Sequence, residues 1–299
     1  MSEPTSNNQL QELILLNIGI LVISTTGVLG RYITIPSVAI IMWRSMVGVF
    51  VLLPLVYYYR SGPLINWKKD GVKVIFSSLM IGGHWITYFY ALEVSNIAIA
   101  VLSLASNIAI TAILEPFILK SKFNKLDLLL GPIILIGIYI MSPAQMDFSN
   151  HLFQGILLGV LSAFCYSLRN IVTKDLVKVY DSRLLMLTQI AIVLILLLPF
   201  PPVYEVMPTS NEWLAIIALG VGASAVGHTL YARGLRSFNA SSVAVAASII
   251  PVYAIFWGYL FLNEAPRPQT IIGGTVIVMV VLIRNLYHWR TYKASTLSH

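Results

Sequence analysis

Charged residues are scarce in this chain of 299 residues. Asp, Glu, Lys and Arg together make up 10% of it, whereas a soluble domain carries roughly 25%. Cys165 is the only cysteine, which excludes an intramolecular disulfide. No phosphate-binding glycine loop, zinc-ligand spacing or nucleophile arrangement occurs either. These absences exclude an ordinary soluble domain and disfavour ATP-driven transport by this chain alone, and we expect no cofactor and no metal.

Apolar residues make up 58% of the chain and gather in runs of about twenty. A helix of that length crosses the roughly 30 Å core of a bilayer. We therefore expect an all-α integral membrane protein with ten transmembrane helices, near residues 12–31, 37–59, 72–92, 95–119, 126–142, 153–175, 183–200, 213–235, 240–262 and 269–287. The first fourteen residues contain no Lys or Arg, and no small-residue cleavage site follows, so the first segment is expected to be a retained helix.

The positions of the basic residues predict an orientation. If the N-terminus is cytoplasmic, 15 of the 19 Lys and Arg residues lie at cytoplasmic helix ends, two lie outside and two lie within helices. This is the bias that the positive-inside rule describes. We expect a multi-pass protein of the inner membrane with both termini cytoplasmic. The net charge of +7 then reflects orientation, and no nucleic-acid partner is expected.

Weak internal similarity divides the chain into two halves. A shift of 143 residues places Tyr88 on Tyr231 and Asn96 on Asn239, and a shift of 138 places Arg31 on Arg169. Because each half has five helices, the second half must cross the membrane upside down, as in many secondary transporters. The predicted units are a tail at 1–11, repeats at 12–142 and 153–287, and a tail at 288–299.

Two segments resemble the drug/metabolite transporter superfamily, EamA type. The first is ALEVSNIAIAVLSLASNIAITAILEPFILKSKF, and the second is GLRSFNASSVAVAASIIPVYAIFWGYLFLNEAPRPQTIIGGTVIV, with Pro251, the Asn263-Glu264 pair and Gly273-Gly274. The first half departs from the pattern at Ser121, where it lacks the acidic residue that Glu264 supplies in the second. The resemblance implies ten helices in two inverted repeats and a transport function, with little indication of the substrate.

Polar side chains follow the fourth predicted helix at i+4 steps, as Ser103, Asn107, Thr111 and Glu115. A polar stripe facing lipid is costly, so it is expected to face a cavity or another helix. A substrate path and ordinary helix–helix hydrogen bonding both explain it. Glu115 precedes Pro116 near the cytoplasmic end. It is a candidate coupling residue, or a gate residue paired with Lys120 or Lys122.

Histidine and aromatic residues recur at equivalent places of the two halves. His84, Trp85 and Tyr88 share one face of the third helix, and His228 and Tyr231 share one face of the eighth. Histidine titrates near neutral pH and suits proton coupling or carboxylate recognition, although a buried histidine is more often structural. The predicted substrate-binding set is His84, Trp85, Tyr88, Ser103, Asn107, Thr111, Tyr166, Arg169, His228, Tyr231, Ser248 and Trp257.

Arg44 and Arg169 fall within predicted membrane helices. An arginine at that depth costs about 2.5–3.5 kcal/mol on insertion scales, so it normally has a partner, lines water or snorkels to headgroups. Arg44 joins Glu115 as a candidate coupling or gate residue. If either arginine faces the cavity, it favours a substrate that carries a carboxylate.

The sequence predicts a secondary transporter, specifically an exporter of amino acids or related small metabolites by alternating access, as a monomer or homodimer among membrane lipids. Proton coupling stays open. Efflux of cationic drugs is the main alternative, and it requires an unpaired carboxylate in mid-membrane. An integral-membrane transferase is a second alternative, and it requires paired carboxylates for a metal. No enzymatic activity is expected.

Cysteine-accessibility labelling tests the predicted topology. Single cysteines at Asn66, Asn124 and Ser295 are expected to react from the cytoplasmic side, and those at Asn150 and Asn211 from the outside, because of the distribution of basic residues. Labelling of positions 66 and 150 from the same side would contradict the inverted repeat.

Overall fold

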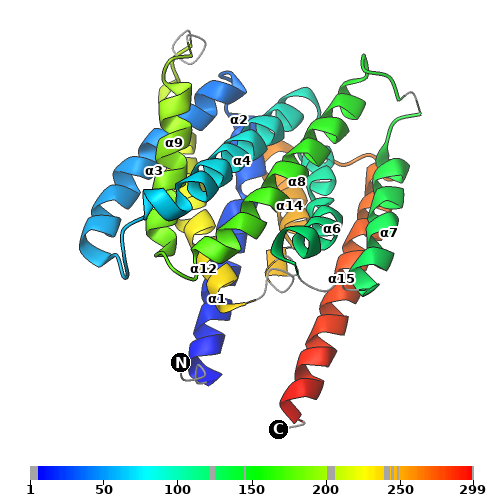
Figure 1. Ribbon diagram of the computed structural model, residues 1–299. Helices are drawn as coiled ribbons and strands as arrows, with labels where there is room; N and C mark the ends of the chain where they lie inside the picture. Colours follow the sequence, from blue (N-terminus) through cyan, green and yellow to red (C-terminus); the bar gives the residue numbers. More distant parts are fainter. Residues whose placement is uncertain are drawn as a thin grey trace.

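The chain folds into ten helical passes (Figure 1). The computed structural model describes residues 6–120, 125–144, 146–200, 206–238, 243, 246–247 and 249–297. Within these residues every regular element is a helix. The elements are α1 (Ser6–Ser24), α2 (Thr26–Tyr32), α3 (Ser37–Tyr59), α4 (Trp67–Val94), α5 (Ile97–Leu104), α6 (Asn107–Leu119), α7 (Lys125–Met141), α8 (His151–Leu176), α9 (Ser182–Leu197), α11 (Ser210–Ile217), the π-helix η1 (Ala218–Gly227), α12 (His228–Ser237), α14 (Ile250–Leu262) and α15 (Pro268–Leu297).

The predicted all-α fold with ten membrane helices is confirmed, although several passes are built from more than one element. The first pass combines α1 and α2, the fourth combines α5 and α6, and the eighth combines α11, η1 and α12. Among the described residues, five spans are long and apolar enough to cross a membrane by length and composition, and four further apolar helices are shorter. Their exposed surfaces carry large apolar side chains such as Phe50, Tyr139 and Leu214, as expected for contact with lipid.

The first helix begins at Ser6 rather than near residue 12, and two further helices also extend beyond their predicted bounds. The third pass begins at Trp67 rather than near residue 72, because the side chain of Asn66 accepts a hydrogen bond from the backbone N–H of Lys69 and caps a polar first turn. The last helix runs to Leu297 rather than ending near residue 287. Hydrophobicity alone misses these extensions, because their sequences are polar.

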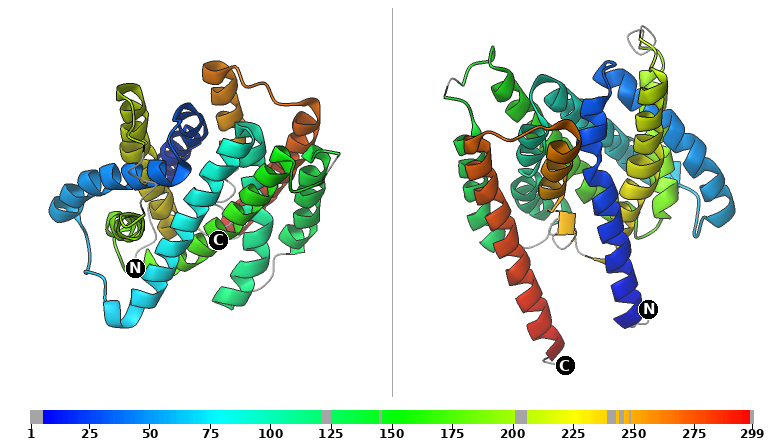
Figure 2. Two further views of the ribbon diagram at one scale, coloured as in Figure 1. Left: turned by 90° about the horizontal axis from the view of Figure 1, so that it is seen from above. Right: turned by 180° about the vertical axis from the view of Figure 1, so that it is seen from behind.

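Contacts between helices repeat when the two halves are exchanged. Helix α4 packs against α8 and α9, and its counterpart in the second half, η1 with α12, packs against α1 and α3. Helices α5 and α6 contact α8, just as α14 contacts α1 and α2. The equivalent helices α3 and α9 contact each other, and so do α7 and α15. This is the pattern of a pseudo-two-fold axis between inverted repeats, and Figures 1 and 2 show the start of α1 and the end of α15 at the same end of the molecule.

A pair of polar links follows the same exchange. The phenol of Tyr180, after α8, donates to Oδ2 of Asp70 in the first turn of α4, at 2.6 Å. The backbone N–H and hydroxyl of Thr34, after α2, donate to Oε1 of Glu212 in the first turn of α11, at 2.7 and 2.8 Å. Each link ties the end of the first pass of one repeat to the start of the third pass of the other repeat, and the two links lie at opposite ends of the molecule.

Asp181 organises the loop at the end that carries the termini. It caps α9 by accepting a hydrogen bond from the backbone of Arg183, and it accepts two more from the backbone N–H and hydroxyl of Ser61. Burial alone raises the pKa of the Asp181 carboxyl, but the side-chain hydrogen bond from Arg183 and the bonds from Ser61 outweigh it and hold the pKa well below its usual range. The carboxylate therefore stays ionised and connects the loop after α3 to α9.

Small residues let the helices approach closely. A Cβ atom built on Gly159 of α8 would lie 2.5 Å from Cβ of Ser103 in α5. Gly220 of η1 lies equally close to Val47 of α3, where the same construction gives 2.6 Å. Glycine is therefore required at these crossings by contact and not by backbone torsion.

Replacing Gly159 tests this packing. Gly159→Ala is expected to lower the stability of the purified protein by about 1–3 kcal/mol, because the added methyl group overpacks the contact with α5. Gly222→Ala is the matched control, since its Cβ would meet only a side-chain atom of Val22 at 3.4 Å. Thermal unfolding in detergent measures both, and equal transition temperatures would contradict the predicted contact.

Candidate functional site

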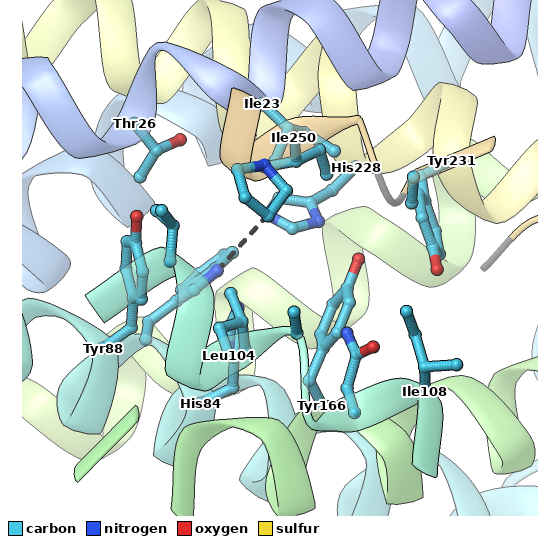
Figure 3. Close-up of a pocket in the computed structure, with 16 residues that line it drawn as sticks. Ile23, Thr26, His84, Tyr88, Leu104, Ile108, Tyr166, His228, Tyr231 and Ile250 are labelled. Carbon is cyan, nitrogen blue, oxygen red and sulfur yellow. Dashed lines mark hydrogen bonds between the residues drawn. The ribbon is translucent and has the colours of Figure 1, made fainter. Parts of the chain in front are cut away.

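A cavity lies between the two halves and is lined by residues from both (Figure 3). Its volume is about 60 Å³, which holds a few water molecules. The described lining residues are Ile23, Thr26, His84, Trp85, Tyr88, Val101, Leu104, Ala105, Asn107, Ile108, Tyr166, His228, Tyr231, Ala247, Ile250 and Pro251. Seven residues of the predicted binding set are among them: His84, Trp85, Tyr88, Asn107, Tyr166, His228 and Tyr231.

His84 is held by a reciprocal pair of hydrogen bonds with Ser162 of α8. The Ser162 hydroxyl lies 3.0 Å from the carbonyl oxygen of His84 and 2.7 Å from its Nδ1. A hydroxyl has one proton, and the carbonyl can only accept, so Ser162 donates to the carbonyl and accepts from Nδ1–H. This fixes the ring and its tautomer. The imidazole ring of His84 stacks with the ring of Tyr88, 6.0 Å away between centroids, and lies 4.5 Å from the centroid of Tyr166.

His228 has one satisfied and one unsatisfied ring nitrogen. Nε1–H of Trp85 donates to Nε2 of His228 at 3.4 Å, so the proton of the neutral imidazole resides on Nδ1. Nδ1 is buried and has no hydrogen-bond partner within the described part of the chain. His228 begins α12 directly after the π-helix, and π-helical segments are frequent at functional sites.

Two tyrosines complete the polar wall of the cavity. Tyr166 of α8 lies 5.7 Å from Tyr231 of α12 and 6.3 Å from His228, centroid to centroid. The hydroxyl of Tyr231 accepts a hydrogen bond from Nδ2 of Asn170 at 3.4 Å. Figure 3 shows Tyr166, His228 and Tyr231 turned toward the same central space.

Arg44 does not line the cavity but lies behind it. Its guanidinium is fully buried, with Nε and Nη2 donating to Oγ of Ser224 at 3.0 and 2.9 Å. Nη1 has no partner. The guanidinium carbon lies 4.4 Å from the ring centroid of Trp85 and 5.5 Å from that of Phe89. Snorkelling to headgroups is therefore wrong for Arg44, which is held by a hydroxyl and two aromatic faces.

Arg169 is also fully buried and held by neutral groups. Nη2 donates to Oε1 of Gln189 at 2.9 Å, and Nη1 donates to Oδ1 of Asn170 at 3.0 Å. Gln189 in turn donates to the hydroxyls of Ser77 and Thr173. Arg169 neither snorkels nor lines the cavity. Among the described residues, neither buried arginine takes part in an ion pair.

The predicted polar stripe of the fourth pass does not face one direction. The helix is interrupted between α5 and α6, so Asn107 begins a new helix and lines the cavity. Ser103 instead packs against Gly159 of α8, and its hydroxyl has no partner. Thr111 is buried outside the cavity lining. An i+4 pattern predicts a common face only where one helix runs without interruption.

Glu115 forms an ion pair, but with a partner that the sequence did not indicate. Nζ of Lys174, on α8, lies 2.6 Å from Oε1 of Glu115, on α6. Lys120 and Lys122 were the expected partners. Lys120 is exposed at the end of α6 and has a left-handed backbone, and Lys122 lies outside the described residues. The pair connects the fourth and sixth passes near the end that carries the termini.

An equivalent ion pair at the opposite end was missed. Nε of Arg31, on α2, lies 3.0 Å from Oε1 of Glu264, which follows α14. Oε2 of Glu264 also accepts from the backbone N–H of Ile97 at the start of α5, at 3.1 Å. This pair joins the first and ninth passes, which are the counterparts of the sixth and fourth. The repeat register did not indicate this pair, because it places Arg31 on Arg169 and Glu264 on Ser121, and neither position belongs to the Lys174–Glu115 pair.

The remaining predicted residues lie elsewhere. Trp257 of α14 donates from Nε1 to Oγ of Ser24 at 3.1 Å, which fixes α14 against α1 outside the cavity lining. Ser248 lies outside the described residues. Within the described part of the chain, no group of three His, Cys, Asp or Glu residues is arranged to hold a metal ion.

Two substitutions on the fourth and third passes test whether the cavity is the transport path. Asn107→Ala and His84→Ala are expected to reduce flux in proteoliposomes by roughly tenfold or more, because each removes a polar group that faces the cavity. Ser103→Ala is the matched control, since that side chain faces α8. Wild-type flux in both cavity variants, or an equal loss in the control, would contradict the assignment.

Comparisons with known proteins agree with this architecture. The EamA-like transporter family matches residues 10–142 and 153–286. A pseudopaline exporter of Pseudomonas aeruginosa is 24% identical over 83% of this chain and 86% of its own. An S-adenosylmethionine uptake transporter of Rickettsia conorii is 25% identical over 87% of each chain. A solved crystal structure with 17% identity shares the fold, with a TM-score of 0.68 over 94% of this chain and 98% of its own. The chain thus belongs to the EamA-like transporter family, within the drug/metabolite transporter superfamily.

Proposed function

We propose that this small-molecule transporter exports amino acids or related metabolites by alternating access, with its two halves rocking about the central cavity. The observation that carries the proposal is the position of the cavity, which is lined by α1, α2, α4, α5 and α6 of the first half and by α8, α12 and α14 of the second. One of the two relatives is named as an exporter and the other as an uptake transporter. The outward direction is supported by the exporter, which the chain resembles over most of its length.

The cavity disfavours the export of cationic drugs. A cation needs a carboxylate within reach, and the described residues that line the cavity include none. Glu115, the one candidate from the sequence, is paired with Lys174 away from the cavity. The transferase alternative lacks support as well, since the described residues offer no cluster of acids for a metal.

We further propose that the two ion pairs act as alternating gates. Lys174–Glu115 joins the sixth and fourth passes at the end with the termini, and Arg31–Glu264 joins the first and ninth passes at the other end. All four passes contribute cavity-lining residues or flank them. The two pairs join equivalent passes of the two halves at opposite ends of the molecule. Opening one end therefore breaks one pair while the other can stay formed. The positive-inside distribution supports a cytoplasmic position for the Lys174–Glu115 pair in an inner membrane.

Removing one acidic partner at a time tests the gates. In a Cys165→Ser protein with a reporter cysteine at Ala105, Glu115→Gln is expected to increase labelling from the cytoplasmic side severalfold, and Glu264→Gln to increase it from the outside. Asp175→Asn is the matched control, because Asp175 pairs with Lys178, three residues later in the turn after α8, and that ion pair joins no two passes. Unchanged labelling in both variants, or an increase from the same side, would contradict reciprocal gates.

Flux measurements test the transport function and its coupling. Proteoliposomes loaded with a panel of amino acids and metabolites are expected to release at least one of these solutes faster than protein-free vesicles loaded in the same way. The same assay with an imposed pH gradient tests proton coupling. If the gradient accelerates flux, Glu115→Gln is expected to weaken that acceleration more than exchange without a gradient. Flux that ignores the gradient in the unmodified protein leaves Glu115 with the gate role alone.

A further inference from the structure

We infer that the cavity selects solutes carrying a carboxylate, and that Arg44 and Arg169 impose this selection from behind the cavity wall. The inference rests on the proposed transport function and specifies the substrate class of its site. Both arginines reach the cavity through one intermediate residue, and each intermediate contacts a lining side chain that has a hydrogen-bond donor to offer.

The first connection runs from Arg44 through Trp85 to His228. The guanidinium of Arg44 lies over the face of Trp85, 4.4 Å from the ring centroid, and the indole N–H of Trp85 donates to Nε2 of His228. A cation over the ring makes the indole N–H a stronger donor, which in turn polarises the imidazole. The remaining proton of His228, on Nδ1, has no acceptor among the described residues, although the residue is only 3% exposed.

The second connection runs from Arg169 through Asn170 to Tyr231. Arg169 donates to the amide oxygen of Asn170, and the amide nitrogen of Asn170 donates to the Tyr231 hydroxyl. Tyr231 also forms a side-chain hydrogen bond with Tyr166, so the two hydroxyls and the Asn170 amide form one network at the cavity wall. Thr26, on the other side of the cavity, adds a buried hydroxyl that has no hydrogen-bond partner among the described residues. His228, Tyr231 and Thr26 surround the central space in Figure 3.

The charges around the cavity do not balance within the described residues. Two guanidinium groups are fully buried, and their partners are Ser224, Gln189, Asn170 and Met186, all of them neutral. The nearby acids are used elsewhere, as in the pairs of Glu115 with Lys174 and Glu264 with Arg31. A buried charge is stabilised by an opposite charge. A carboxylate in the cavity supplies that charge and also accepts the Nδ1 proton of His228.

Three probes that carry the same 3-methylbutyl group on different head groups test the selection: 4-methylpentanoate, 4-methylpentanamide and 3-methylbutylphosphonate. Binding is measured with the purified full-length protein as a shift in thermal unfolding, and in parallel as inhibition of flux in proteoliposomes. The carboxylate is expected to act at roughly tenfold lower concentration than the amide, because only the carboxylate compensates the buried charge. Equal potency of the two would overturn the inference, and a phosphonate that acts alone would overturn the carboxylate assignment.

Variants test the part played by the arginines. Arg44→Gln and Arg169→Gln are expected to reduce the preference for carboxylate over amide, and Arg44→Lys to retain more of it than Arg44→Gln, since the charge is kept. Tyr231→Phe, which removes only a hydroxyl, gives the same test if an arginine variant fails to fold. Trp257→Phe, outside the cavity, is the matched control. An unchanged preference in every folded variant would overturn the assignment. Binding of the carboxylate probe without flux of any solute in the amino acid and metabolite panel would instead contradict the proposed transport function.

Discussion

The burial of two guanidinium groups without a carboxylate partner is the constraint on which the centre of this protein depends. An arginine at the middle of a membrane helix costs about 2.5–3.5 kcal/mol on insertion scales, and the cost is reduced only by polar partners. Arg44 meets Ser224 and the face of Trp85, while Arg169 meets Gln189 and Asn170. These contacts fix α3 against η1 and α8 against α9. The same residues that hold the arginines therefore also position the helices around the cavity.

Because of the inverted repeat, the polar links and ion pairs at one end of the molecule have counterparts at the other end. The Asp70–Tyr180 and Glu212–Thr34 links hold helix starts to the loops opposite them, and the two ion pairs join the passes that border the cavity. The symmetry is not carried by residue identity, since an Asp–Tyr link corresponds to a Glu–Thr link. What is kept is the chemical function of a carboxylate in the first turn of a helix that accepts from the partner loop.

The sequence predicts the helices and their division into halves well, because both follow from the lengths of apolar runs and the spacing of sparse identities. It also predicts the central His and Tyr residues of the third and eighth passes, which fall at equivalent places. It fails where a helix is broken. The interruption between α5 and α6 separates Ser103 from Asn107, and no periodicity shows it. It also fails for partners, because Lys174 and Glu115 are 59 residues apart and meet only once α8 packs against α6.

The two ion pairs differ in their exposure to solvent, and this has a consequence for ionic strength. The side chains of Arg31 and Glu264 are 38% and 24% exposed, against 20% and 14% for Lys174 and Glu115. Dissolved salt screens exposed charges over a Debye length of about 8 Å at physiological concentration and affects buried pairs much less. Raising the salt concentration therefore weakens the Arg31–Glu264 contact first. The equilibrium between opening at one end and opening at the other therefore depends on the salt concentration on the Arg31–Glu264 side of the membrane. It depends much less on the salt concentration on the Lys174–Glu115 side.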